Sequence, residues 1–277
     1  MSVTYPMPSL PISYFNDSAR FPVIAGPCLA ESYEVLAEVA AKVLELQQKL
    51  PVNFIFKSSY RKANRTSGGS FSGIGDEAAL ALLARIKSET GLPILTDIHL
   101  PDEAAMAAEV ADVLQIPAFL ARQSDLLEAA AKTGKIINIK KAQFMAAADM
   151  KFAREKVIAA GNPNVLLTER GTSFGYGDLV VDFRSLVIMR SFGSPVIYDA
   201  THSVQRPSQN GISGGAREFI APLARAAMAV GIDGLFIETH PDPANAKSDA
   251  ASQLPLGDLE RLLESLLAIR ESVIVSR

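Results

Sequence analysis

The hydrophobic pattern along the chain alternates between two kinds of segment. Short runs rich in β-branched residues recur, and each is followed by a longer stretch whose apolar positions have helical spacing. The expected strands are residues 22–25, 53–57, 93–97, 113–116, 136–140, 165–170, 195–199 and 234–238. The expected helices are residues 33–50, 77–90, 103–111, 125–133, 149–160, 182–191, 216–230 and 256–275.

This alternation predicts an α/β fold, a single (β/α)8 TIM barrel built from eight strand–helix units. A doubly wound open sheet is the structural alternative. We expect residues 1–277 to form one domain, in which 22–277 are the barrel and 1–21 form a short N-terminal hairpin or arm over its floor.

Composition narrows the class of protein. The chain is 48% hydrophobic and 21% charged, which is ordinary for a globular protein. A single cysteine excludes an internal disulfide and suits a reducing compartment. The first residues lack the features of a secretory signal, and no apolar run is long enough to span a bilayer, so we expect a cytoplasmic protein without membrane contact. The net charge of −3 argues against nucleic acid as a partner, so anionic ligands would need a local group of cations.

Polar residues end the predicted strands. Strands buried on both faces should be continuously apolar, but here the apolar runs close on charged groups. They are Lys57, Asp97, Lys140, Arg170, Asp199 and Glu238, with Gln115 inside the fourth run and His202 just after the seventh. In a barrel all these ends meet at one rim, where active sites are built. The pattern therefore predicts a site of mixed charge at that rim.

Cations are the first part of this predicted site. Six of them fall at or just beyond strand ends: Lys57, Lys62, Arg65, Arg122, Lys140 and Arg170. Most Lys and Arg residues lie on solvated helix faces, but these do not fit such faces. Buried cations need anionic partners, and arginine binds phosphate or carboxylate through two parallel hydrogen bonds. The group indicates a small-molecule ligand with several anionic groups.

A candidate metal site is the second part. Cys28 follows the first strand, His202 the seventh, Glu238 ends the eighth, and Asp249 lies in the loop after it. Barrel closure makes these strands neighbours. A thiolate, an imidazole and two carboxylates suit a divalent ion such as Fe²⁺, Zn²⁺ or Mn²⁺. The spacing is no local motif, however, and a lone cysteine is more often a small core residue.

Several segments resemble a known family when they are taken in order. They are Ile24-Ala-Gly-Pro-Cys28, Phe56-Lys-Ser-Ser-Tyr-Arg-Lys-Ala-Asn-Arg-Thr-Ser67, Leu95-Thr-Asp-Ile-His99, Gln115-Ile-Pro-Ala-Phe-Leu-Ala-Arg-Gln123, Asn138-Ile-Lys-Lys141, Thr168-Glu-Arg-Gly-Thr-Ser-Phe-Gly-Tyr176, Tyr198-Asp-Ala-Thr-His202 and Phe236-Ile-Glu-Thr-His-Pro241. From about residue 22 to 267 the chain resembles the 3-deoxy-D-manno-octulosonate 8-phosphate synthase family. The stretch from Lys62 to Ser67 is the specific part.

The resemblance implies a transferase that condenses phosphoenolpyruvate with D-arabinose 5-phosphate and water. The products are 3-deoxy-D-manno-octulosonate 8-phosphate and inorganic phosphate, on the route to bacterial lipopolysaccharide. It implies that phosphoenolpyruvate is held by Lys57, Ser59, Lys62, Gln115, Lys140 and Arg170. The aldose phosphate would be held by Asn64, Arg65 and Thr66, and its hydroxyls by Asp97. Ala118 and Arg122 are further substrate-binding candidates.

The resemblance also assigns the metal and the assembly. Members with cysteine at position 28 require a metal, which implies Cys28, His202, Glu238 and Asp249 as ligands, and members are homotetramers. Lys57, Lys62, Lys140, Asp199 and His202 are the catalytic candidates, the last two as proton carriers near the reacting water.

Departures from the family's pattern leave an alternative open. Arg61 stands where the family commonly has Asp, Gly68-Gly69 where it has Ile-His, and Ser72 where it has Arg. All lie in the loop after the second strand, which borders the aldose phosphate. The alternative is 3-deoxy-D-arabino-heptulosonate 7-phosphate synthase, acting on erythrose 4-phosphate, against which Asn64 argues. A non-catalytic barrel that senses phosphorylated sugars would need the cations but not the metal ligands.

Overall fold

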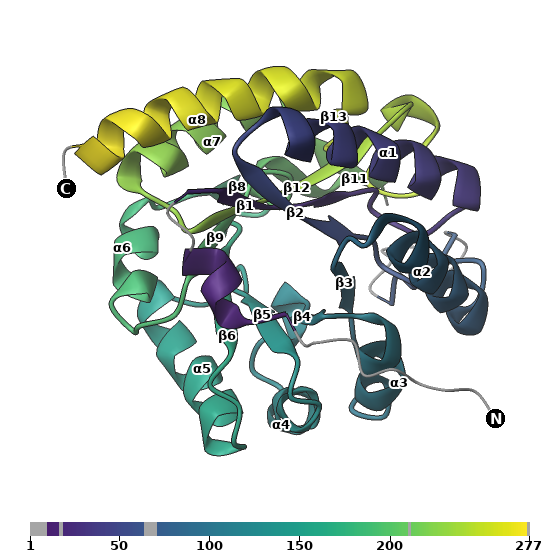
Figure 1. Ribbon diagram of the computed structural model, residues 1–277. Coiled ribbons are helices and arrows are strands. Elements are labelled where there is room, and N and C mark those ends of the chain that lie inside the picture. The colour runs from purple at the N-terminus through teal and green to yellow at the C-terminus, as the bar shows by residue number, and fades with distance from the viewer. Residues whose placement is uncertain (1–9, 17–18, 64–70, 210–211, 276–277) are drawn as a thin grey trace.

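A closed barrel of parallel strands forms the centre of the molecule (Figure 1). The computed structural model describes residues 10–16, 19–63, 71–209 and 212–275. The barrel strands are β1 (Phe21–Gly26), β2 (Val52–Lys57), β3 (Ile94–Asp97), β4 (Val113–Ile116), β5 (Ile136–Lys140), β6 (Val165–Glu169), β9 (Val196–Asp199) and β12 (Gly234–His240). Neighbours pair in this order, and β12 pairs with β1 in parallel, which closes the sheet. The predicted (β/α)8 barrel is confirmed.

Helices surround the strands (Figure 1). They are α1 (Tyr33–Lys49), α2 (Asp76–Thr90), α3 (Glu103–Val110), α4 (Ser124–Lys132), α5 (Met150–Ala159), α6 (Arg184–Arg190), α7 (Ile220–Val230) and α8 (Leu259–Val275). Helix α1 shows how the pattern produces them. Ser32 caps it by accepting a hydrogen bond from the Val35 amide at 3.3 Å, and its buried residues recur at helical spacing, at Leu36, Val39, Val43 and Leu46.

Two apolar layers separate along each strand because successive side chains point to opposite faces. In β1, Val23 and Ala25 pack against the helices, whereas Ile24 packs inside the barrel. The inner cluster consists of Phe15, Ile24, Ile55, Leu95, Val113, Ile136, Leu166, Ile197 and Phe236. Phe15 comes from a 3-10 helix, η1 (Ile12–Asn16), the purple turn in front of the strands in Figure 1. The described part of the N-terminal segment is thus a helical turn that packs against the barrel interior.

Short strands that the hydrophobic pattern did not predict decorate the loops after the barrel strands. Four of them form two antiparallel hairpins, β7 (Thr172–Phe174) with β8 (Asp178–Val180) and β10 (Gln205–Gln209) with β11 (Ile212–Gly215). Strand β13 (Leu254–Pro255) extends the sheet beside β12. At Gly215 a Cβ would lie 2.9 Å from the Ala251 carbonyl, so the second hairpin packs tightly on the loop after β12.

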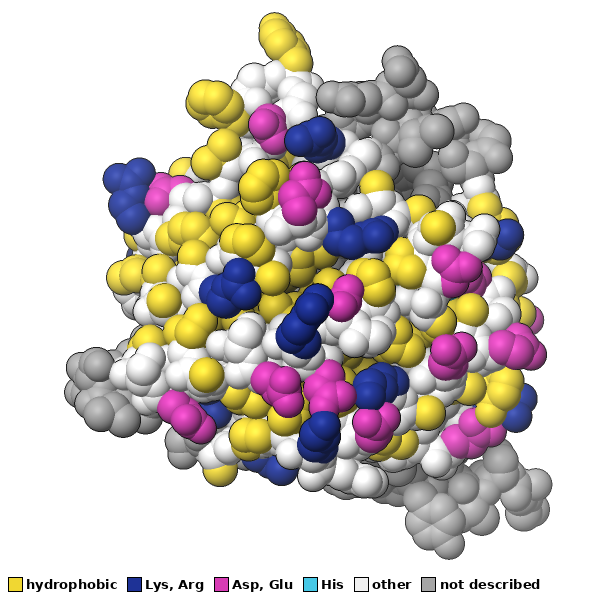
Figure 2. All heavy atoms as spheres, turned by 90° about the horizontal axis from the view of Figure 1, so that it is seen from above, with side chains coloured by type: hydrophobic (Ala, Val, Ile, Leu, Met, Phe, Trp, Pro, Cys, Tyr) yellow, Lys and Arg dark blue, Asp and Glu magenta, His cyan; other side chains and the backbone are white. Residues whose placement is uncertain are grey.

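The outer surface mixes both signs of charge. Figure 2 looks onto the face of α1 and α8, where basic and acidic side chains lie among apolar ones. Lys42 and Lys49 of α1 both pair with Glu260 of α8, Lys42 at 3.4 Å. Among the described residues, no helix combines the length and the apolarity that crossing a membrane requires.

Candidate active site at the carboxyl end of the barrel

The loop after β1 is held against β2. A Cβ on Gly26 would lie 2.0 Å from the Lys57 carbonyl oxygen, so only glycine allows this close approach. Beyond it, the Ser59 amide donates to the Cys28 carbonyl at 3.2 Å, and the Ala30 amide donates to the Ser59 carbonyl at 2.9 Å. These bonds fix the position of Cys28 at the end of the barrel.

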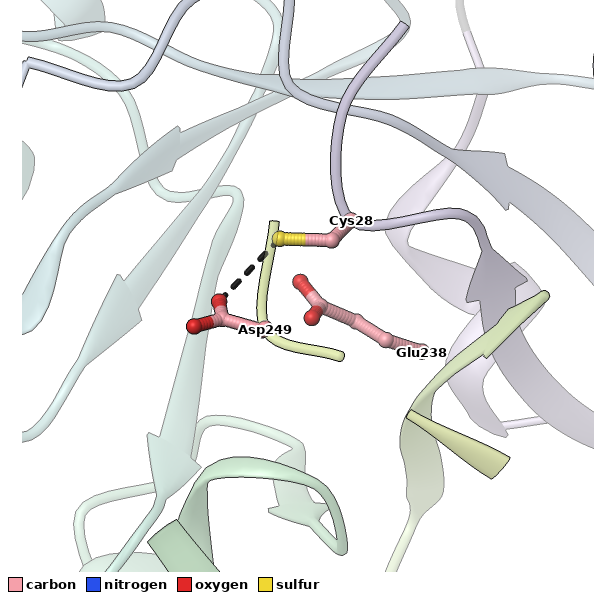
Figure 3. A group of neighbouring side chains, drawn as sticks. All are labelled: Cys28, Glu238 and Asp249. Atoms are coloured by element: carbon pink, nitrogen blue, oxygen red, sulfur yellow. Dashed lines mark hydrogen bonds between the residues drawn. The ribbon is translucent and has the colours of Figure 1, made fainter. Parts of the chain in front are cut away.

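Cys28, Glu238 and Asp249 form a compact cluster, which we call the metal corner. Their side chains point towards one another from the loop after β1, from β12 and from the loop after β12 (Figure 3). One ligand atom from each lies within 4.8 Å of the others, and Cys28 Sγ is 3.1 Å from Asp249 Oδ2. His202 joins them, because its Nε2 is 3.8 Å from Glu238 Oε1 and 3.9 Å from Asp249 Oδ2. Three of the four expected ligands thus lie in one cluster, and His202 lies beside two of them.

The donor atoms of the metal corner, together with His202, fit a divalent ion. Sulfur, imidazole nitrogen and two carboxylates are a set that transition metals accept. Glu238 Oε2 is fully buried and has no hydrogen-bond partner among the described residues, which is a costly arrangement unless a cation completes it. Glu238 Oε1 is paired with Lys57, whose Nζ also donates to the Cys28 carbonyl at 2.9 Å.

Charges within the corner follow from burial and from these neighbours. Burial, together with Asp249 and Glu238, raises the pKa of the Cys28 thiol well above its usual range. Burial alone would also raise the pKa of Glu238, but Lys57 and His202 reverse the shift and lower it. The carboxylate is therefore ionised while the thiol keeps its proton, so metal binding at this corner must release a proton from Cys28.

Asp199 orients His202. One of its carboxylate oxygens lies 2.9 Å from His202 Nδ1, and the other accepts the His202 backbone amide at 2.9 Å. A carboxylate beside Nδ1 favours the tautomer with its hydrogen there, which leaves the Nε2 lone pair facing the metal corner. Lys140 Nζ pairs with the same carboxylate at 2.8 Å and lies 3.9 Å from the centre of the Phe236 ring. Asp199 thus serves both the imidazole and a buried cation.

A chain of hydrogen-bonded polar side chains crosses the barrel mouth. Ser59 and Gln115 both donate to Asp97. Asn138 donates to Gln115 at 2.9 Å and accepts from Thr168 at 2.6 Å. All five are buried. Such a network fixes Asp97 and Gln115 in one orientation before any ligand arrives.

Arg170 and Lys62 add positive charge to the mouth. Arg170 is buried, its Nη2 donates to Gln205 Oε1 at 3.0 Å, and its Nη1 has no partner among the described residues. Burial lowers the pKa of Arg170, although the negative charge of Asp199 acts to raise it. Burial would lower the pKa of Lys62 too, but Cys28, when its thiol is ionised, and the carboxylates of Glu238 and Asp249 raise it. Both cations therefore lie where an anion would be stabilised.

The remaining predicted residues lie further out. Ala118 is buried in the turn η2 (Ala118–Leu120), and Arg122 is exposed in the loop that follows. Arg61 pairs with Asp76 at 3.1 Å and with Glu103, so this departure from the family pattern ties the start of the loop after β2 to α2 and α3. The predicted aldose-phosphate residues Asn64, Arg65 and Thr66, and the departure Gly68-Gly69, lie outside the described residues.

Sequence reasoning missed several polar side chains that brace the site. Gln205 contacts both Arg170 and Asp249, each at 3.0 Å. Gln253 accepts from the Cys28 amide at 3.1 Å and donates to the Ser248 carbonyl at 2.8 Å. Only Asn138 could have been recognised from the sequence, because it is a polar residue inside an apolar strand, as Gln115 is.

A second brace joins the two loops that carry metal-corner residues. Glu31, after β1, accepts from His240 Nε2 at 2.9 Å and from the Lys247 amide at 2.8 Å. His240 Nδ1 accepts from the Asp242 amide at 3.0 Å, which makes Nε2 the donor. Glu31 thereby holds the segment just before Asp249.

The sequence is similar to that of a known protein family over nearly its whole length. Residues 14–273 match the model of the DAHP synthetase I family. Three relatives are named 2-dehydro-3-deoxyphosphooctonate aldolase. The one from Brucella anthropi is 55% identical over 92% of each chain. Those from Rhizobium meliloti and Bartonella quintana are 54% and 53% identical, and each alignment covers 91% or more of both chains. A family match over nearly the whole length, with relatives of this identity, shows that the chain belongs to the DAHP synthetase I family.

Proposed function

We propose that the protein is an enzyme that condenses phosphoenolpyruvate with D-arabinose 5-phosphate and water, giving 3-deoxy-D-manno-octulosonate 8-phosphate and inorganic phosphate for lipopolysaccharide synthesis. The observation that carries this proposal is the juxtaposition at one barrel mouth of buried cations, above all Lys140 and Arg170, with the metal corner. The relatives' shared name, 2-dehydro-3-deoxyphosphooctonate aldolase, supports the same reaction.

The cations address the main physical difficulty of the reaction, which is to hold two phosphorylated anions together. Lys57, Lys140 and Arg170 are buried and Lys62 is partly buried, so together they would neutralise phosphoenolpyruvate from positions shielded from water. The enol carbon then attacks the aldehyde, water adds to the adjacent carbon, and phosphate leaves as the carbon–oxygen bond of the tetrahedral intermediate breaks. Charge develops next to groups that need no reorganisation, and this preorganisation lowers the activation free energy of the reaction.

The residues around the mouth have separate tasks in this scheme. A divalent metal bound by Cys28, His202, Glu238 and Asp249 would supply Lewis acidity, either to lower the pKa of a water or to orient the aldehyde. Asp199 would keep the His202 ring oriented through the 2.9 Å contact at Nδ1. Asp97, held by Ser59 and Gln115, presents a carboxylate suited to sugar hydroxyls.

The acceptor sugar distinguishes this proposal from the alternative. A seven-carbon synthase would use erythrose 4-phosphate, but the relatives are named for the eight-carbon product, as 2-dehydro-3-deoxyphosphooctonate aldolase. Asn64, Arg65 and Thr66 remain the proposed aldose-phosphate residues, with Arg122 and Ala118 as outer contacts. Arg61, anchored by Asp76 and Glu103, would set where that loop begins.

We further propose a cytoplasmic homotetramer. Large apolar side chains are exposed on the loop before α5, on α5 itself, on the β7–β8 hairpin and on α6, namely Phe144, Phe152, Phe174 and Val187, each at least 57% exposed. Exposed apolar surface of this kind is typical of a surface that a second copy covers. The single thiol of Cys28 suits a reducing compartment.

A paired-substrate assay tests the proposed reaction. The purified protein is incubated with phosphoenolpyruvate and either arabinose 5-phosphate or erythrose 4-phosphate, with and without chelator, and phosphate release is followed. We expect release with the five-carbon sugar and its loss after prolonged chelation. Preference for erythrose 4-phosphate would favour the seven-carbon alternative, and release with neither sugar would refute the proposed reaction.

A further inference from the structure

A single side chain connects the cationic part of the mouth with the metal corner. Gln205, the first residue of β10, uses both ends of its amide group. Its Oε1 accepts from Arg170 Nη2 at 3.0 Å, and its Nε2 donates to Asp249 Oδ1 at 3.0 Å. Arginine has only donors and a carboxylate only acceptors, so the reversed amide would lose both bonds. The orientation of Gln205 is therefore determined by its two partners.

On the metal side, Gln205 determines which way the Asp249 carboxylate points. With Oδ1 held by Gln205, Oδ2 is the oxygen that faces Cys28 Sγ at 3.1 Å and His202 Nε2 at 3.9 Å. The Asp249 backbone has a φ of 47°, a left-handed conformation that few non-glycine residues adopt. Amides of Ser252 and Gln253 secure its carbonyl at 3.0 and 3.1 Å, which leaves the side chain to be oriented by Gln205.

On the substrate side, Gln205 occupies one edge of the Arg170 guanidinium. The second terminal nitrogen, Nη1, is buried and lacks a partner among the described residues, so it is the donor available to a ligand oxygen. Because the guanidinium is planar and rigid, an anion bound at Nη1 also fixes the direction of Nη2. Anion binding at Arg170 then restricts Gln205, and Gln205 restricts Asp249.

From this geometry we infer that Gln205 is a positioning residue that couples phosphoenolpyruvate binding at Arg170 to metal binding at Asp249. This inference rests on the proposed function. Each ligand bears part of the cost of ordering the same three side chains, so the first to bind eases the binding of the second. Such coupling is reciprocal, and couplings of this type change affinity by about 5- to 150-fold.

The test measures coupling rather than turnover. In the full-length protein, Mn²⁺ affinity is measured with and without saturating phosphoenolpyruvate, and phosphoenolpyruvate affinity with and without Mn²⁺. Gln205→Met keeps the length of the side chain at a partly exposed position but removes both hydrogen bonds. Gln253→Met is the matched control, because Gln253 braces Cys28 and Ser248, whereas the described partner of the Arg170 guanidinium is Gln205.

We expect the wild-type protein to bind Mn²⁺ more tightly in the presence of phosphoenolpyruvate, and Gln205→Met to reduce that enhancement by about fivefold or more. Direct attraction between the two ligands persists in every variant, so the difference between variants is the informative quantity. Gln253→Met should weaken Mn²⁺ binding equally in both conditions. An unchanged enhancement in Gln205→Met, or an equal loss in Gln253→Met, would overturn the inference. Wild-type protein that binds neither ligand would instead refute the proposed function.

Discussion

Lys140 and Asp199 form a buried pair whose two members should respond differently to substitution. Replacing Lys140 with Met removes the cation but keeps the length of the side chain against Phe236. Asp199 then still accepts from the His202 amide at 2.9 Å, the Thr201 amide at 3.1 Å and the His202 ring. Replacing Asp199 with Asn instead leaves Lys140, which is buried, without its carboxylate partner at 2.8 Å.

The magnitudes follow from this asymmetry. A lost charge-assisted hydrogen bond costs about 1.5–3 kcal/mol, but Lys140→Met also removes a buried ammonium, so we expect a net loss of stability within about 1 kcal/mol. The lowered pKa of Lys140, caused by burial, shows that its charge is costly to hold there. In Asp199→Asn that charge is unpaired, and the free energy of unfolding should fall by about 3–5 kcal/mol. Both variants should lose about 10²- to 10³-fold in kcat/KM.

Two assays separate these effects. Equilibrium urea unfolding followed by circular dichroism gives the stability of each variant, and phosphate release gives kcat/KM. The double variant Lys140→Met/Asp199→Asn should be more stable than Asp199→Asn alone, because the unpaired cation is gone. Equal destabilisation in the two single variants would refute the asymmetry, and near-normal turnover in Lys140→Met would contradict its place in the phosphoenolpyruvate site.

Three further predictions concern other parts of the site. Cys28→Ala should abolish stoichiometric Mn²⁺ binding, measured as the metal content of the dialysed protein, whereas retained stoichiometric metal would argue against the corner. Glu31→Gln, which weakens the brace to His240, should lower Mn²⁺ affinity by about 10- to 100-fold in chelator competition while metal-free phosphoenolpyruvate binding stays the same. Burial lowers the pKa of His99 below 6.5, against Asp97 and Glu103. As pH falls below 6.5 the unfolded chain takes up a proton that the folded chain resists, so stability is lost there. Unfolding of His99→Gln should depend less on pH between 6.5 and 5, and an unchanged slope would exclude His99 as the cause.

The barrel and the positions of its strands were predictable because each strand is buried on both faces. Such strands leave continuous apolar runs, and their boundaries in the structure differ from the expected ones by at most two residues. Lys57 and Lys140, which end their strands, and Glu238, two residues before the end of β12, were found for the same reason. Lys141, the residue after β5, instead pairs with Glu169 at 3.4 Å and donates to the Gly171 carbonyl at 3.1 Å.

The braces and hairpins were not predictable from local pattern. Gln205 lies in a polar stretch that reads as loop, and its partners Arg170 and Asp249 are 35 and 44 residues away. The β10–β11 hairpin has two glycines where strands usually carry apolar residues, and one of them, Gly215, is required by contact with the loop after β12. Where tertiary packing decides the local structure, propensity carries little information.

The pairing of β1 with β12 has a consequence for the order of events during synthesis. Cys28 emerges from the ribosome 221 residues before Asp249. A nascent chain that ends before β12 would lack Glu238 and Asp249, and so could not form the ion site. An ion could bind at this corner only after β12 has paired with β1, so ion uptake would report that the last barrel strand has docked. A circular permutant that begins at β9 would reverse this order, bringing His202, Glu238 and Asp249 out of the ribosome before Cys28.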